Sequence, residues 1–560
     1  MMFPGAYQVR SAHAPLGREL AKYLSLAFRR PPGQEGYPFE IKVTGDGGEG
    51  FHVSLGEAGT LIRAGSVRGA FYGVYAFLEK ALGCRFLAED CEIIPPFRGR
   101  LSPMEWEEAP AFKYREAYWR GALCGDMALK LRLNSARAQI SPEQGGRTPF
   151  YNYSHSFLDL LDPEEWFDTH PEYFSLVNGK RQKEKSQLCL TNPRVVELVV
   201  EKLRQWIRDN PDCAIFSVAM NDWYGHCECP SCRAVDRAEG GSAGTMLKFV
   251  NQVAEAVAQE YPGRFIHTFA YLYCRKPPET LRARDDVIVR LCPIERCFSH
   301  AIDACHQEVA RIDVEMTKRA AFAPGGRFTQ DLEGWARKAS NLYIWDYTVN
   351  FANYLQPFPI QASLAGSLRY YRAQGVSGVF LQGNYSPGSA SAFGALKIYQ
   401  MSRLMWDPAL DAQALADAFV KDYYGRAAAP YVLEALALSE QAVSGVHMSL
   451  FDRLDAPYLQ EAFLAKLEDL LRTALCNTRD RKRRRRLELE LLSPRYCRLA
   501  ALPLDTPGRA DMVEAFARDA RALGISELFE RRELEASFAC LKDSRYALDR
   551  ERVPHAVYRL

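Results

Sequence analysis

The sequence predicts an α/β protein: a (β/α)₈ TIM barrel, preceded by a small α/β domain and followed by an all-helical C-terminal region. From about residue 110 to 405, short apolar runs alternate with amphipathic helical segments, as expected for βα units and a parallel sheet. About eight such units in roughly 300 residues match the size of a TIM barrel. The alternative, an open doubly wound sheet, needs a Gly-rich phosphate-binding turn after an early strand, and none is visible.

Length and charge limit the class of protein. The chain has 560 residues, enough for about two to four domains, and a net charge of +2 from 71 basic and 69 acidic residues. This balance gives no long-range field for nucleic acid or an anionic membrane, so neither is expected as a partner. No apolar run approaches the roughly 18 residues of a membrane-spanning helix.

The cysteine content predicts a compartment. The chain has 15 cysteines, and its first residues show no basic stretch followed by an apolar one, the pattern of a secretory signal. An odd number of cysteines without such a signal favours reduced thiols in the cytoplasm.

Three domains are predicted, at 1–105, 106–407 and 408–560. In the first, residues 39–43 and 51–55 alternate apolar and polar side chains as strands do. A helical pattern follows at 69–82 and ends at Gly83, a common residue after a helix C-terminus.

The second and third domains follow from the same patterns. Barrel strands are expected at 115–119, 137–140, 187–190, 214–220, 265–271, 287–292, 342–345 and 378–381. Tail helices are expected at 412–424, 428–443, 458–473, 483–502 and 509–523. Because the tail shows apolar stripes and charged faces without converging polar residues, we expect it to contribute shape and no chemistry.

Three carboxylates stand directly after predicted strands, where the working residues of a TIM barrel lie. They are Asp222, Glu295 and Asp346. Glycosidic cleavage needs one carboxyl group to protonate the leaving oxygen and another group to stabilise a positive anomeric centre. These positions therefore predict catalytic residues for sugar chemistry. The alternative is that each carboxylate caps a helix or pairs with an arginine.

Polar and aromatic residues near the same strand ends are candidate substrate-binding residues for an oligosaccharide or glycan. They are His155, Tyr271, Tyr273, Trp345, Tyr347, Gln382 and Asn384. His155 fits equally well as a hydrogen-bonded histidine of the core or of a loop.

A second constellation is rich in cysteine. Cys227, Cys229 and Cys232 have a C-x-C-x-x-C spacing that allows three thiolates to face one Zn²⁺ ion. A closed structural site needs a fourth ligand, which His226 or Cys189 could supply. Free or oxidised loop thiols are the alternative. No cofactor is expected for catalysis, because cysteine-rich zinc sites are usually closed.

Several segments, taken in order, resemble one known family. They are His155-Ser-Phe-Leu, Pro171-Glu-Tyr-Phe, Gln187-Leu-Cys-Leu-Thr-Asn-Pro, Asn221-Asp222 with the cysteines, Glu295, Ile344-Trp-Asp-Tyr, Gly378-Val-Phe-Leu-Gln-Gly, Leu404-Met-Trp-Asp-Pro and Tyr423-Tyr-Gly. The series resembles the domain-of-unknown-function 4838 family, classified as glycoside hydrolase family 163. Residues 69–86 look like the small α/β domain that precedes the barrel in hexosaminidases and α-glucuronidases.

The resemblance implies an endo-β-N-acetylglucosaminidase that acts on N-glycans with retention, plausibly using the acetamido oxygen of the substrate as nucleophile. It implies that Asp222, at what counts as the fourth strand, is the acid/base, and that Asn221 steadies the acetamide. The sequence departs from the family at Leu381, where many members have Glu. A catalytically inactive glycan-binding homologue and a zinc-dependent hydrolase using the cysteines therefore remain as alternatives.

Overall fold

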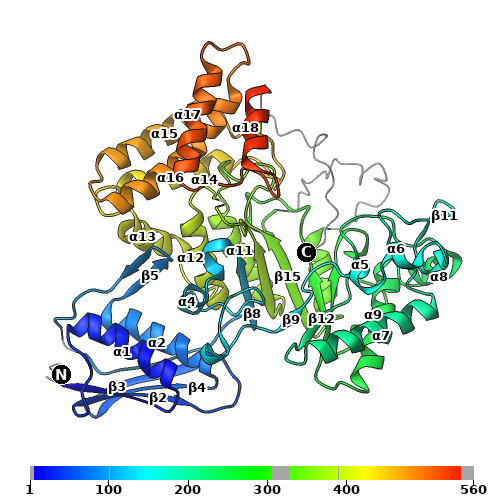
Figure 1. The fold of residues 1–560 in the computed structure, drawn as a ribbon, viewed down its shortest axis with the longest axis horizontal. Helices are drawn as coiled ribbons and strands as arrows, with labels where there is room; N and C mark the ends of the chain where they lie inside the picture. Colours follow the sequence, from blue (N-terminus) through cyan, green and yellow to red (C-terminus); the bar gives the residue numbers. More distant parts are fainter. Residues whose placement is uncertain (1–5, 100, 306–326, 389, 544–560) are drawn as a thin grey trace. The chain divides into compact units, whose positions relative to one another are not determined.

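The structure of the protein, a computed structural model, describes residues 6–99, 101–305, 327–388 and 390–543 (Figure 1). The chain divides into two compact units. The first comprises Met1–Thr148 and Phe393–Tyr423, and the second comprises Pro149–Ala392 and Tyr424–Leu560. The domain boundaries expected near 105 and 407 stay predictions.

The first unit contains the small α/β layer that the sequence predicts. Its five-stranded sheet has the order β1 (Tyr7–Ser11), β2 (Tyr37–Val43), β4 (Gly59–Ala64), β3 (Phe51–Gly56) and β7 (Met104–Glu108). Helices α1 (Ala14–Phe28) and α2 (Val67–Leu82) pack together, and α2 also packs on the sheet (Figure 1). The Ser66 hydroxyl caps the start of α2, and Gly83 ends it with φ 73°.

The rest of the first unit is built from short elements and two helices that come later in the chain. They are β5 (Arg85–Ala88), β6 (Cys91–Ile93), β8 (Tyr114–Tyr118), α3 (Arg120–Leu123), α4 (Gly125–Lys130), η1 (Pro142–Gln144), α12 (Gly394–Trp406) and α13 (Ala412–Tyr423). Helix α12 packs against β8, although the two elements lie far apart in the sequence.

The second unit is organised around a parallel sheet that curls into a half-barrel (Figure 1). Its strands have the order β16 (Gly378–Gln382), β15 (Asn341–Tyr347), β14 (Val287–Leu291), β13 (Phe265–Ala270), β12 (Ile215–Ser217) and β9 (Phe150–Tyr151). All five pairings between them are parallel. Five of these strands lie where apolar runs predicted them.

Two predicted strands, at 137–140 and 187–190, do not form. Around 137–140 the backbone turns, because Ala138 N–H donates to Ser135 and Gln139 N–H donates to the Leu123 carbonyl. At 187–190 only an isolated bridge joins Leu188 to Phe174. The short strand β9 was not expected. The strand at 214–220 was expected to be the fourth of the barrel, and the strands that form do not support this numbering.

Helices and short elements connect the strands of the second unit. They are α5 (Phe157–Leu160), α6 (Pro163–Trp166), η2 (Pro171–Tyr173), β10 (Leu176–Val177), β11 (Lys180–Arg181), α7 (Pro193–Asp209), α8 (Pro230–Ala238), α9 (Ala243–Ala258), η3 (Leu272–Cys274), α10 (Phe328–Ala336) and α11 (Gln361–Ala373). Pro193 and Asn192 begin α7, with the Asn192 side chain accepting the Arg194 N–H.

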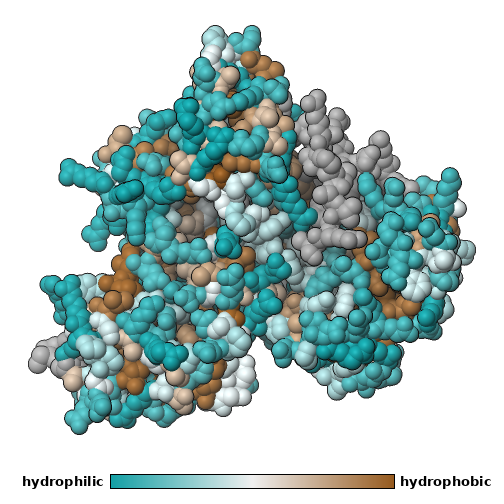
Figure 2. All heavy atoms as spheres, viewed as in Figure 1, coloured by the Kyte–Doolittle hydropathy of each residue, from teal (hydrophilic) through white to brown (hydrophobic). Residues whose placement is uncertain are grey.

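The tail of the second unit is a stack of helices: α14 (Ala429–Val443), α15 (Glu461–Cys476), α16 (Arg481–Ala501), α17 (Arg509–Ala522) and α18 (Leu534–Asp543). Each helix packs on the next. On the face seen in Figure 2 the tail is mostly hydrophilic, in keeping with amphipathic helices that bury one stripe. None of the helices in the described ranges is long and apolar enough to cross a membrane.

Close packing between two strands gives a test of the fold. Gly378 on β16 pairs with Tyr343 on β15, and a Cβ atom added at Gly378 would lie 2.7 Å from atoms of the Tyr343 ring. We expect Gly378→Ala to destabilise the protein by about 1–3 kcal/mol, because the ring cannot move without disturbing the buried strand. The urea unfolding midpoint measures this. Gly241→Ala, where nothing lies within 4 Å, is the matched control. Equal midpoints for both variants would contradict the packing described.

Candidate functional site

The loops that follow β12 and β9 place an acid and a histidine side by side. His155 Nδ1 lies 2.5 Å from the Met220 carbonyl oxygen, which can only accept, so Nδ1 carries the proton. This bond aims Nε2 at Asp222 Oδ1, 3.7 Å away. The two side chains are 22% and 26% exposed, so solvent and ligands can reach both. We call His155 and Asp222, together with Tyr271, Tyr347 and Glu530, the mouth cluster.

Two tyrosines complete the mouth cluster from the ends of β13 and β15. Tyr271 and Tyr347 are buried, and burial raises the pKa of both well above the usual value for tyrosine. The negative charges of Asp222 and Glu295 raise these pKa values further. Both tyrosines therefore stay protonated and can donate hydrogen bonds at the mouth.

A fifth group comes from the tail and was not predicted. Glu530 lies between α17 and α18, and the Tyr385 hydroxyl donates to its Oε1 at 3.2 Å. Burial raises the pKa of Glu530, and the charge of Asp222 adds to this increase, although Arg531 and Tyr385 oppose it. A tail carboxylate whose pKa the charge of Asp222 raises counts against the expectation that the tail contributes shape alone.

No sequence motif marks Glu530. The nearest signal is an apolar pair, Leu528-Phe529, in a loop of an otherwise polar region. The structure explains the pair, because the Leu528 carbonyl accepts the Tyr354 N–H at 2.9 Å and so fixes the loop on the barrel side of the unit.

The two other predicted carboxylates serve buried ion pairs. Glu295 Oε2 lies 3.0 Å from Arg275 Nη1, and Arg275 Nε lies 2.8 Å from Asp331. Asp346 is fully buried and bonds Arg296 through both oxygens, at 3.0 and 3.1 Å. Both carboxylates are thus committed to arginine, the alternative that the sequence left open.

Asp346 has two further partners that complete its shell. The Tyr371 hydroxyl donates to Oδ2 and the Tyr347 N–H donates to Oδ1, each at 2.8 Å. This carboxylate therefore anchors the end of β15, and through the backbone of Tyr347 it positions a residue of the mouth cluster.

Both polar atoms of the Asn221 side chain are hydrogen-bonded to backbone groups. Its Oδ1 accepts the Leu158 N–H at 3.3 Å and its Nδ2 donates to the Ser186 carbonyl at 2.8 Å. Gln187 bonds both the N–H and the carbonyl of Asn221, each at 3.0 Å. These bonds argue against the expected role of steadying an acetamide and indicate that Asn221 positions the loop that carries Asp222.

The remaining predicted binding residues lie deeper or to one side. Trp345 Nε1 donates to Gln382 Oε1 at 2.8 Å, and its ring packs on Phe380 at 4.0 Å between centroids. Asn384 is buried and donates to the Ala390 carbonyl at 3.3 Å. Tyr273 stacks on His226 at 4.9 Å. The ring of Trp345 thus belongs to the aromatic interior of the sheet.

The predicted cysteines converge. The sulfurs of Cys189, Cys227, Cys229 and Cys232 all lie within 4.8 Å of one another, and all four residues are buried. Cys189 is therefore the fourth member of this four-cysteine cluster, and His226 is not. None of the 15 cysteines forms a disulfide.

Polar groups surround the sulfurs of the four-cysteine cluster. The Leu176 N–H lies 3.3 Å from Cys227 Sγ, the Thr191 hydroxyl lies 3.1 Å from Cys232 Sγ, and Arg181 Nη1 lies 3.8 Å from Cys227 Sγ. Donors around sulfur stabilise thiolates, the form that binds metal. Cys189 and Cys229 sulfurs are 3.7 Å apart.

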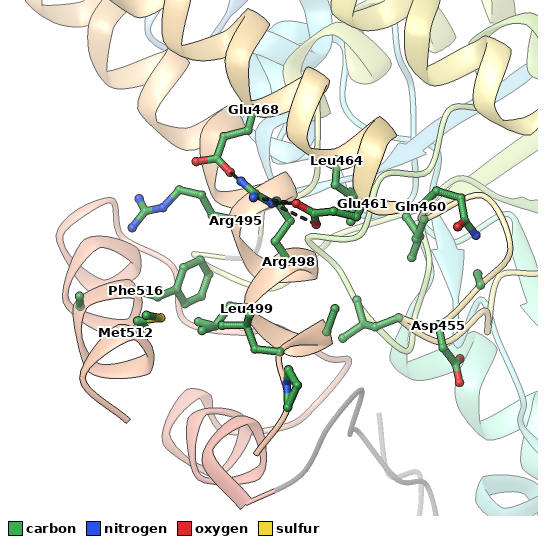
Figure 3. A pocket seen from close by; sticks show the side chains of 17 residues that line it. Asp455, Gln460, Glu461, Leu464, Glu468, Arg495, Arg498, Leu499, Met512 and Phe516 are labelled. Atoms are coloured by element: carbon green, nitrogen blue, oxygen red, sulfur yellow. Dashed lines mark hydrogen bonds and ion pairs between the residues drawn. The ribbon is translucent and has the colours of Figure 1, made fainter. Parts of the chain in front are cut away.

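A pocket of about 740 Å³ opens in the tail among α15, α16 and α17 (Figure 3). Arg498 crosses its wall and pairs with Glu461 at 2.7 Å and Glu468 at 2.6 Å. Arg495 pairs with Asp519 at 2.7 Å. These charges satisfy one another within the helices, and the pocket includes no member of the mouth cluster.

A family model described as a domain of unknown function, DUF4838, matches residues 86–436. The chain belongs to the DUF4838 family. No curated protein matches it.

Two solved structures share the fold. One is CpGH89 from Clostridium perfringens in complex with GlcNAc-α-1,4-galactose, at 10% identity and TM-score 0.53, covering 92% of this chain and 65% of that one. The other is BtGH115A, a GH115 4-O-methyl-α-glucuronidase with specificity for decorated arabinogalactans, at 10% identity and TM-score 0.50, covering 94% of this chain and 80% of that one. At this identity the likeness concerns the fold alone.

Buried ion pairs at the ends of β14 and β15 give a second test. We expect Arg296→Met to destabilise the protein by about 3–5 kcal/mol, because it leaves the buried Asp346 charge without its cationic partner. Denaturant unfolding measures the loss. Asp346→Asn should lose a similar amount, because it leaves the buried Arg296 guanidinium without its carboxylate. If Asp346→Asn instead unfolded like the wild type and abolished activity, Asp346 would be a catalytic residue and its anchoring role would be wrong.

Proposed function

We propose that this protein is a glycoside hydrolase that cleaves β-linked N-acetylglucosamine in glycans, with Asp222 as the acid/base. One observation carries the proposal. Of the three carboxylates that the sequence singled out, Asp222 alone forms no ion pair with an arginine of the described residues, and it lies partly exposed beside a histidine. We take the half-barrel sheet of this fold as the core of a (β/α)₈ barrel, whose catalytic residues lie at the strand ends.

The geometry around Asp222 suits proton transfer. Because His155 Nδ1 is held by the Met220 carbonyl, Nε2 meets Asp222 with either a lone pair or a second proton. Either side chain can therefore carry the proton, and the Asp222 carboxyl group can deliver it to a leaving glycosidic oxygen. After the bond breaks, the same carboxylate can take a proton from the attacking water.

The positive anomeric centre needs a partner, and two groups are available. The resemblance to glycoside hydrolase family 163 favours the acetamido oxygen of the substrate, with overall retention and endo action. Since Asn221 is committed to the backbone, we propose that the protonated hydroxyls of Tyr271 and Tyr347 orient the acetamide instead. Glu530 is the second group, and as a carboxylate it could stabilise the centre directly.

The rival functions have specific weaknesses or supports. Leu381, where many relatives have Glu, is fully buried on β16 and favours an inactive glycan-binding homologue. The mouth cluster, with a reachable acid beside a histidine, favours activity. A zinc-dependent hydrolase centred on the four-cysteine cluster is less favoured, because four protein ligands would leave no open position for water.

Asp222→Asn tests the proposed acid/base. We expect turnover of glycans, whose leaving groups are poor, to fall by about 10²–10⁴, because protonation of the leaving oxygen is lost. Turnover of aryl glycosides with activated leaving groups should fall far less. Single-turnover kinetics on both substrate types make the measurement. An equal loss on both, or loss of bound metal, would mean that Asp222 has a structural role.

The variant Glu530→Gln tests whether the substrate acetamide or Glu530 stabilises the positive anomeric centre. If the acetamide is the nucleophile, this variant should keep most of its turnover on N-acetylglucosaminides. A loss comparable to that of Asp222→Asn, with binding of a product glycan unchanged, would assign the partner role to Glu530. Glu527→Gln, in the same loop, is the matched control. A wild-type protein that binds N-glycans and turns over neither substrate type would establish the inactive homologue.

We also propose that the four-cysteine cluster holds a structural Zn²⁺. With Zn–S bonds of about 2.3 Å, tetrahedral geometry puts sulfurs about 3.8 Å apart, and the Cys189–Cys229 separation of 3.7 Å fits. The ion would join the segment before α7 to the loop between β12 and α8, which continues from Asp222.

Removal of this metal gives a further prediction. Cys229→Ser should lose one equivalent of zinc per chain and lower activity indirectly, by loosening the loop after Asp222. Elemental analysis and hydrogen exchange of residues 221–230 make the measurement. The exposed Cys476→Ser is the control. Full zinc content in Cys229→Ser would contradict the assignment.

A further inference from the structure

A second group of metal-binding residue types lies outside the mouth cluster and the four-cysteine cluster. Cys297, His300, Cys305 and His447 place one ligand atom each within 4.8 Å of all the others. We call them the Cys/His cluster. Three of its members lie in the nine-residue segment 297–305, which follows β14, and the fourth follows α14 in the tail. The sequence alone gave no sign of it, because His447 is 142 residues from Cys305.

The separations within the Cys/His cluster match those around one tetrahedral ion. Cys297 Sγ lies 3.3 Å from His300 Nδ1, and Cys305 Sγ lies 3.5 Å from His447 Nδ1. For Zn–S of about 2.3 Å and Zn–N of about 2.0–2.1 Å, a tetrahedron places sulfur and nitrogen about 3.5 Å apart. The two imidazole rings approach each other at 5.4 Å between centroids with an angle of 64°.

The outer hydrogen bonds fix one ligand in the correct form. His300 Nε2 lies 3.0 Å from the Ser444 carbonyl oxygen, which can only accept, so Nε2 carries the proton. The lone pair of the neutral ring is then on Nδ1, which faces Cys297. A ligating histidine whose other N–H donates to a carbonyl is the usual arrangement at zinc sites.

The backbone brings the two loops together independently of the side-chain ligands. Phe298 N–H donates to the Met448 carbonyl at 3.0 Å, and Met448 N–H donates to the Ser299 hydroxyl at 2.9 Å. The Ser299 hydroxyl in turn donates to the Val446 carbonyl. These bonds hold the ligand-bearing segments in register, so a metal would meet a prepared site.

We propose that the Cys/His cluster is a Cys₂His₂ zinc site that fastens the tail to the loop after β14. Two thiolates and two neutral imidazoles form a complete shell of four, which is typical of a structural site. Soft thiolate together with imidazole selects zinc over magnesium, calcium or manganese. The same loop carries Glu295 and Arg296, so the ion would stabilise the segment behind the mouth cluster.

Metal analysis of His447→Asn tests the proposal. His447 is exposed, so its replacement should leave packing intact. We expect zinc, measured by mass spectrometry on protein purified under reducing conditions, to fall by one equivalent per chain relative to the wild type. His170→Asn, at a histidine whose side chain is 42% exposed, is the matched control and should keep all its zinc. This difference does not depend on glycosidase activity or on whether the four-cysteine cluster also binds metal.

A second measurement uses the wild-type protein and does not depend on a variant. Zinc is removed with a chelator and added back, and alkylation of Cys305 by iodoacetamide is followed by peptide mass mapping. Zinc should slow this alkylation severalfold, because a bound thiolate is no longer a free nucleophile. Equal zinc in His447→Asn and the wild type would overturn the proposal, as would alkylation indifferent to zinc. A Cys297–Cys305 disulfide, or iron or copper in place of zinc, would overturn it too.

Discussion

Buried arginine–carboxylate pairs at the ends of β14 and β15 are the constraint on which the mouth of the second unit depends. Arg275 holds Glu295 and Asp331, and Arg296 holds Asp346. A buried charge without its partner is costly, so each pair fixes the direction in which its loop leaves the sheet. Asp346 positions Tyr347, because the Tyr347 N–H donates to the Asp346 carboxylate. The position of Tyr347 in the mouth cluster thus depends on a carboxylate that is paired with arginine.

Much of the architecture could be predicted because apolar runs and helical stripes report burial directly. Five sheet strands of the second unit and the tail helices from 428 onward lie where these patterns placed them. The prediction of a strand at 187–190 was wrong because this apolar segment is buried for another reason. Its Cys189 belongs to the four-cysteine cluster. Burial explains an apolar run equally well in a strand or around a cluster of thiols, and periodicity cannot separate the two.

The candidate site was only partly predictable, for a different reason. Position after a strand singled out Asp222, Glu295 and Asp346 alike, but it could not show which of them an arginine would claim. Glu530 and His447 were missed because their partners are more than a hundred residues away in the chain. Local sequence carries no trace of such pairings, whereas the short C-x-C-x-x-C spacing did reveal three sulfurs that meet.

The position of Glu530 has a practical consequence for how members of this family are produced. The family match spans 86–436, and a protein trimmed to those limits would keep His155, Asp222 and both tyrosines. It would lose the tail carboxylate Glu530, which accepts the hydrogen bond of the Tyr385 hydroxyl. If such a fragment shows no turnover, the truncation alone could be the cause, so the result would say nothing about the 560-residue chain.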